Sequence, residues 1–134
     1  MFHPWHDLHP SVCVEFASLP PPLRGATDGC SRIVLHNRLE QVERRCTLEH
    51  EKVHIDRGDM GKCRPEVERS IDRTVARRLV SLDSLMSAMV WTDEIEELAD
   101  ELWVTPQIAR ARLEILLPAE VALISELIAD LRAA

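Results

Sequence analysis

Tyrosine is absent from this chain of 134 residues, and aromatic residues together make up only 4% of it. Hydrophobic residues reach 46%. A core can therefore form, but it must consist of aliphatic side chains, which favours helices. No run of about 18 apolar residues occurs, so we expect no membrane-spanning helix. The first residues have neither the basic start nor the apolar stretch of a signal peptide. We therefore expect a single cytoplasmic domain.

Cysteine pairs of the C-x-x-C type are also missing, so a cysteine zinc knuckle is not expected. The four cysteines are separated by 16 or 17 residues, and we expect free thiols at Cys13, Cys30, Cys46 and Cys63. Basic residues are few, with 16 Lys and Arg against 23 Asp and Glu and a formal net charge of -7. An acidic protein repels nucleic-acid phosphate, so direct nucleic-acid binding is not expected.

Hydrophobic periodicity predicts two short strands followed by helices. The strands are expected at residues 12–16 and 32–36, and the proline and glycine residues between them predict a loop. Helices are expected at residues 39–56, 65–79, 83–90, 94–103, 106–113 and 118–132. The prediction is an α+β fold, mostly helical, with a small N-terminal β-sheet. Residues 1–30 form an irregular segment and the first strand, 31–90 the central part, and 91–134 the C-terminal helices.

The run His50-Glu51-Lys52-Val53-His54 has the H-E-x-x-H form of a zinc peptidase. In a helix, His50 and His54 lie on one face and can bind one ion. Zinc suits imidazole ligands, and a catalytic zinc site keeps one position for water. Glu51 can accept the proton of that water as it attacks a peptide carbonyl. The motif fixes only three residues and can therefore occur by chance. An ordinary charged helix without a metal site is the alternative.

A third ligand is predicted on the next helix. Glu68 and Asp72 are four residues apart, so both face the same way. We expect Glu68 to bind the metal and Asp72 to steady a ligating histidine through its second ring nitrogen. The alternative is an exposed charged face. Four other side chains compete for the role of third ligand, and these are Asp56, Asp59, Cys63 and Glu66.

Three motifs resemble the ImmA/IrrE-type zinc metallopeptidases of phages and mobile elements. They are RCTLEHEKVH at residues 45–54, ERSID at 68–72 followed by VARRL at 75–79, and LADELWVTPQIARARL at 98–113. Glu49 and Lys52 depart from the family pattern, which has a small and an apolar residue there. The Met-Pro turn common after the second helix is also missing. The resemblance covers roughly residues 31–116.

The resemblance implies a zincin-like fold in which the small sheet packs on the H-E-x-x-H helix. It also implies a zinc endopeptidase that cleaves a cytoplasmic regulatory protein, which in phage members is a repressor encoded nearby. Zincins often pair an extended substrate with an edge strand, and Ile33, Val34 and Leu35 are the candidates for that role. An ordinary core strand is the alternative. Without tyrosine, His36 or Arg45 are the candidates for stabilising the oxyanion.

Two other functions stay open. Residues 93–113 also resemble a helix-turn-helix, which would make the chain a DNA-binding regulator. Against this, residues 93–134 carry ten acidic and three basic residues. Gln107, Arg110 and Arg112 are few contacts for a recognition helix. The second alternative is a degenerate relative that binds zinc without cleaving. Three N-terminal histidines, His3, His6 and His9, suggest a second metal site, but the prolines beside them favour an exposed segment.

Overall fold

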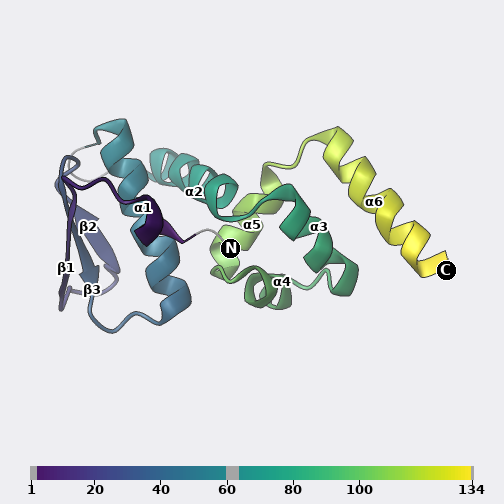
Figure 1. Cartoon of the computed structure of the whole chain (residues 1–134), viewed down its shortest axis with the longest axis horizontal. Coiled ribbons are helices and arrows are strands. Elements are labelled where there is room, and N and C mark those ends of the chain that lie inside the picture. Colours follow the sequence, from purple (N-terminus) through teal and green to yellow (C-terminus); the bar gives the residue numbers. More distant parts are fainter. Residues whose placement is uncertain (1–2, 60–63, 134) are drawn as a thin grey trace.

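The computed structural model describes residues 3–59 and 64–133, and its mixed α+β composition agrees with the prediction. A short 3-10 helix (Pro4–Asp7) precedes the strands β1 (Cys13–Ala17), β2 (Gly25–Thr27) and β3 (Arg32–His36). The helices are α1 (Gln41–Arg57), α2 (Pro65–Leu79), α3 (Leu82–Trp91), α4 (Ile95–Leu102), α5 (Pro106–Glu114) and α6 (Pro118–Ala133). Figure 1 shows the sheet at one end of the molecule, α6 at the other, and the remaining helices between them.

The sheet has the order β1-β3-β2, with β1 parallel and β2 antiparallel to β3. Two predictions are wrong here. Residues 25–27 form a strand where a loop was expected, because the short run Gly-Ala-Thr has little strand signal of its own and forms only by pairing with β3. The strand with Ile33, Val34 and Leu35 is central and paired on both sides, so it is not an edge.

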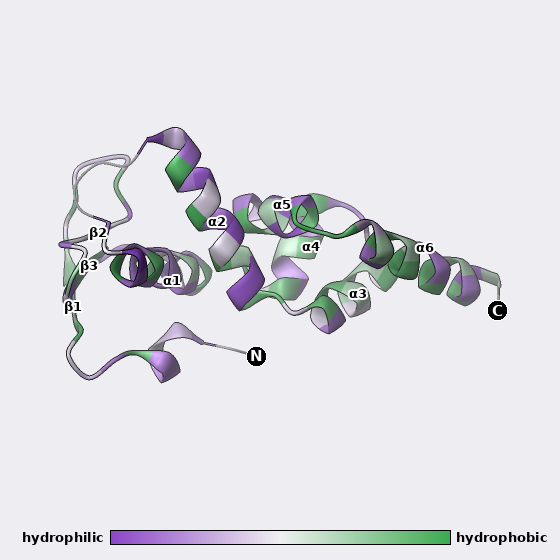
Figure 2. Ribbon diagram, turned by 90° about the horizontal axis from the view of Figure 1, so that it is seen from above, coloured by the Kyte–Doolittle hydropathy of each residue, from purple (hydrophilic) through white to green (hydrophobic). Residues whose placement is uncertain are grey.

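The sheet packs on α1, as expected, through a small apolar cluster. Ile33 and Leu35 of β3 point to the same face, and both are fully buried against Leu48 of α1. Figure 2, which looks along α1, places this helix between the sheet and the other helices. Helix α1 is therefore held by apolar contacts with the sheet on one side and with the other helices on the other side.

The larger core is aliphatic and lies among the helices. It consists of buried Leu, Ile, Val and Ala side chains from α2 to α6, together with Cys46 and Val53 of α1. Helix α6 packs on α3 through Ile124 and extends away from the body of the molecule (Figure 1). No helix in the described residues combines the length and apolar character needed to cross a membrane.

The helix boundaries follow local signals with one exception. Pro65, Pro106 and Pro118 begin helices, where a missing N–H has no cost. Helix α4 was expected to begin at residue 94, but it begins at Ile95. The carboxylate of Glu94 is its cap and accepts the N–H groups of residues 96 and 97. A carboxylate at this position also interacts favourably with the helix dipole.

Buried charges on α1 explain the departures from the family pattern. Glu49 is 1% exposed and lies 3.0 Å from Arg78 Nη1 and 3.4 Å from Lys52 Nζ. Lys52 Nζ also donates to the carbonyl of Pro4. A buried carboxylate needs such partners. Glu49 and Lys52 therefore form an ion pair. Glu49 also connects α1 to α2 through Arg78, and Lys52 connects α1 to the N-terminal segment through Pro4.

Candidate metal centre

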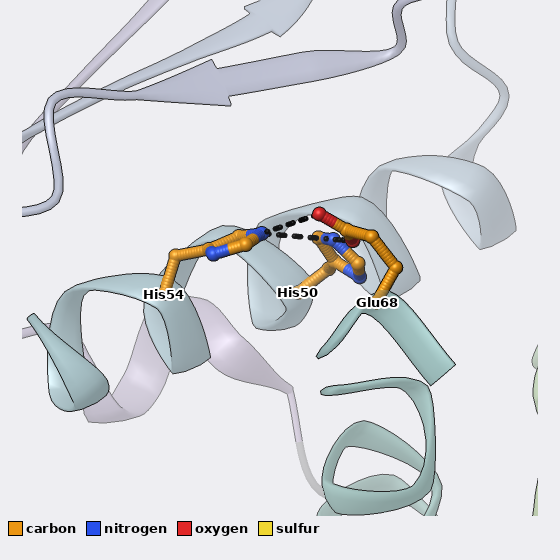
Figure 3. A group of neighbouring side chains, drawn as sticks. All are labelled: His50, His54 and Glu68. Carbon is orange, nitrogen blue, oxygen red and sulfur yellow. Dashed lines mark hydrogen bonds and ion pairs between the residues drawn. The ribbon is translucent and has the colours of Figure 1, made fainter. Parts of the chain in front are cut away.

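Three nitrogen and oxygen donors converge from α1 and α2. The Nε2 atoms of His50 and His54 are 3.2 Å apart. Glu68 reaches both, with Oε2 at 2.8 Å from His50 Nε2 and Oε1 at 3.4 Å from His54 Nε2. Figure 3 shows the three side chains pointing toward one another from two helices. This group could hold a metal ion, and within residues 3–59 and 64–133 no other three such donors come as close.

Each histidine is oriented through its second ring nitrogen. His50 Nδ1 lies 3.3 Å from Oδ1 of Asp72, the contact that the sequence predicts. His54 Nδ1 lies 3.3 Å from Oδ2 of Asp59, which sequence reasoning treated as a competing ligand. Gly58, at φ 68°, ends α1 in the left-handed region and turns the chain so that Asp59 folds back onto the helix. A carboxylate at Nδ1 leaves the lone pair of Nε2 for an ion.

Glu51 lies beside the three donors and is 6% exposed. Burial raises the pKa of this carboxyl to about 7; the charge of His50 opposes the shift and that of Glu68 adds to it. Gly25 of β2 packs directly on it, because a Cβ at Gly25 would lie 3.3 Å from Glu51 Oε1 and 2.7 Å from Thr47 Cγ2. A group titrating near neutrality in this position is suited to accept a proton.

The pKa of His50 is also raised. Burial lowers it, but the hydrogen bond to Asp72 and the charges of Glu51 and Glu68 raise it more. His50 and Glu51 thus influence each other, as expected for side chains at a functional site rather than on a solvated helix face.

Because the pKa of Glu51 is raised, we expect the free energy of unfolding of the metal-free protein to depend on pH. The folded chain holds the proton up to about pH 7, and the unfolded chain loses it near 4.5, the ordinary pKa of a glutamate carboxyl. The free energy of unfolding therefore falls as the pH rises between these values, by about 3 kcal/mol. Glu51→Gln should remove this part of the decline. Urea unfolding in excess chelator at pH 5 and pH 8 measures it. Equal declines in both proteins would contradict the prediction.

A hollow of about 340 Å³ adjoins Glu51 and His50 between β2, α1, α2 and α5. Its other walls come from residues of all four elements, among them Arg24, Thr47, Asp72, Thr105, Gln107 and Ile108. Asp72 and Gln107 are joined in this wall by a hydrogen bond of 2.6 Å between Nε2 and Oδ2. Of the three donor residues, His50 lines this hollow together with Glu51, so these two side chains can be reached from its open side.

Several sequence-based candidates lie elsewhere. Asp56 is paired with Arg78, Glu66 is exposed, and Cys63 lies outside the described residues. Arg45 cannot meet an oxyanion, because it is fully buried and donates to backbone carbonyls of residues 79, 102 and 103. His3 and His6 have ring centroids 6.0 Å apart but form no three-donor group within the described residues.

The segment resembling a helix-turn-helix packs against α2 through its helix α5. Arg112 is buried and donates to the carbonyl of Val80 at 2.8 Å, and Gln107 is bonded to Asp72. Two of the three side chains considered for base contacts are thus engaged within the molecule. Trp103 ends α4 at φ 58°, the turn position where glycine is usual.

Comparisons with protein-family models, with curated proteins and with solved structures find no match to this chain. The likeness to the ImmA/IrrE-type peptidases therefore rests on the three sequence motifs, and membership of that family stays a prediction.

Proposed function

We propose that the chain is a zinc-dependent endopeptidase of the H-E-x-x-H type. The observation that carries the proposal is the convergence of His50, His54 and Glu68 beside the buried carboxyl of Glu51. Two imidazoles, one carboxylate and an adjacent acid form the ligand set and base of a hydrolytic zinc site.

The spacing of the donor atoms supports zinc. Ligands about 2.0–2.1 Å from a tetrahedral zinc ion lie about 3.3 Å from one another. The two imidazole nitrogens are 3.2 Å apart, and the two oxygens of Glu68 lie 2.8 Å from His50 Nε2 and 3.4 Å from His54 Nε2, respectively. One tetrahedral position is left for water, which suits a catalytic rather than a closed structural site.

Zinc bound there would polarise a carbonyl and lower the pKa of water to about 7. Glu51 takes the proton from the attacking water, and its position between His50 and Gly25 keeps the carboxyl out of bulk solvent. It then passes the proton to the leaving amine. Asp72 and Asp59 hold the two imidazoles in the orientation that leaves Nε2 free to bind.

An extended substrate would pair with β2 rather than with the central strand β3. Arg24 O accepts from His36 N, and Asp28 N donates to Arg32 O, so these residues bond toward β3. Because bonding direction alternates along an antiparallel strand, Gly25 and Thr27 direct their backbone groups toward the free edge. Gly25 touches Glu51, so a peptide paired there lies beside the base.

The target proposed is a cytoplasmic regulatory protein, and a phage or mobile-element repressor is the form that the family resemblance suggests. The open side of the site and the edge of β2 are compatible with a segment of another protein chain. The net charge of -7 supports a protein target over nucleic acid.

The test compares zinc-loaded wild type with Glu51→Gln. We expect the wild type to cleave an unfolded protein or peptide mixture, read out by mass spectrometry. We expect Glu51→Gln to keep its zinc but lose at least about 100-fold in rate, since the base is removed and the ligands stay. Glu66→Gln, at an exposed position of α2, is the matched control and should cleave like wild type. Equal cleavage by Glu51→Gln would exclude the proposed base.

A further inference from the structure

Asp72 uses both of its carboxylate oxygens. Oδ1 lies 3.3 Å from His50 Nδ1, and Oδ2 accepts a hydrogen bond of 2.6 Å from Gln107 Nε2. Gln107 is in the first turn of α5, far from Asp72 in sequence. Hydrogen bonds to an ionised acceptor are short and roughly twice as strong as neutral ones. A continuous chain of contacts thus runs from α5 through α2 to a metal-donor histidine on α1.

We propose that Gln107 is a positioning residue of the metal centre. Its amide holds Oδ2, and the carboxylate plane then directs Oδ1 at His50 Nδ1. That contact keeps the proton on Nδ1 and the lone pair on Nε2, beside Glu68 and His54. The inference rests on the metal-binding part of the proposed function and does not depend on peptide cleavage.

The backbone at Gln107 is held in place by the contacts of the first turn of α5, as a positioning side chain requires. Thr105 caps α5 by accepting Ile108 N, and the same residue is hydrogen-bonded to Cys46 of α1. Ile108, Ala109 and Ala111 are buried in the main core. The first turn of α5 therefore has a set place relative to α1.

The side chain of Gln107 adds little to the core. Gln107 is exposed, and its hydrogen bond to Asp72 crosses the wall of the hollow beside Glu51. Removing the amide should therefore change the metal site more than the stability of the fold. This difference separates a positioning role from a merely structural one.

The first experiment measures zinc affinity of the full chain by competition with a chromophoric chelator. Gln107→Met keeps the length but removes the donor, and we expect about a tenfold weaker affinity. Gln107→Glu should lose more, because it adds a negative charge beside Asp72. Arg110→Met, on the same helix and also exposed, is the matched control and should bind like wild type. Unfolding in excess chelator should be the same for wild type, Gln107→Met and Arg110→Met.

The second experiment repeats Gln107→Met in an Asp72→Ala background. If Gln107 acts through Asp72, the second change should cost no further affinity. An equal tenfold loss with Asp72 already removed would overturn the inference, and so would a Gln107→Met protein that binds zinc like wild type. Failure of the wild type to bind zinc would overturn both this inference and the proposed zinc site. Zinc binding without cleavage by the wild type would remove only the peptidase activity.

Discussion

His50→Ala should abolish stoichiometric zinc binding. Purified wild type is expected to hold close to one zinc per chain. Without His50, only His54 and Glu68 remain as donors of the group. Asp72 also loses its contact with the His50 imidazole. Loss of an outer contact costs about 10–100-fold in affinity, so loss of a ligand should cost at least about 100-fold. Metal analysis after gel filtration, with a chelator competition assay, measures the change.

His9→Ala is the matched control, because His9 is exposed and bonds locally to Ser11. It should keep its zinc. A His50→Ala protein that still carries one zinc per chain would show that the ion sits elsewhere. Absence of zinc from gently purified wild type would refute the metal centre itself.

Arg45→Ala should be the most destabilising single substitution considered. Arg45 is fully buried, and its guanidinium donates to the carbonyls of Leu79 at 3.2 Å and Trp103 at 2.7 Å. It thereby joins α1 to the ends of α2 and α4, and it holds Trp103 in its left-handed conformation. Leaving these acceptors buried without a donor should cost about 3–5 kcal/mol. Urea unfolding in excess chelator gives this value.

Arg44→Ala provides the comparison on the same helix. Arg44 is only partly buried, donates to Leu39 O at 3.3 Å and stacks over Phe16. Its loss should cost about 1 kcal/mol. Similar losses for the two arginines would mean that the buried carbonyls find other donors, and the role assigned to Arg45 would be wrong.

The three side chains that converge at the candidate metal centre were predictable because their signals are local. His50 with His54, and Glu68 with Asp72, are pairs four residues apart, and any helix brings such pairs to one face. The structure confirms the three-donor group and the contact of Asp72 with His50. The contact of Asp59 with His54 Nδ1 could not be predicted, because it depends on the turn at Gly58.

Other features depended on partners distant in the sequence. The strand β2 has only three residues, of which Gly25 and Ala26 have weak strand propensity, and it exists because β3 pairs with it. That pairing makes β3 central and moves the free edge to Gly25 and Thr27. Glu49 and Lys52 differ from the family pattern, and only the structure shows that Glu49 pairs with both Lys52 and Arg78.

The sequence by itself determined the aliphatic helical core, the six helices and two of the three strands in the described residues, and the pairing on one helix face of His50 with His54 and of Glu68 with Asp72. The two pairs follow from spacing within one helix, where backbone geometry sets which side chains share a face. Only the tertiary structure decided how α1 and α2 cross, which strand has the free edge, and that Gln107 reaches Asp72. These depend on packing between segments far apart in the chain, which no local pattern encodes.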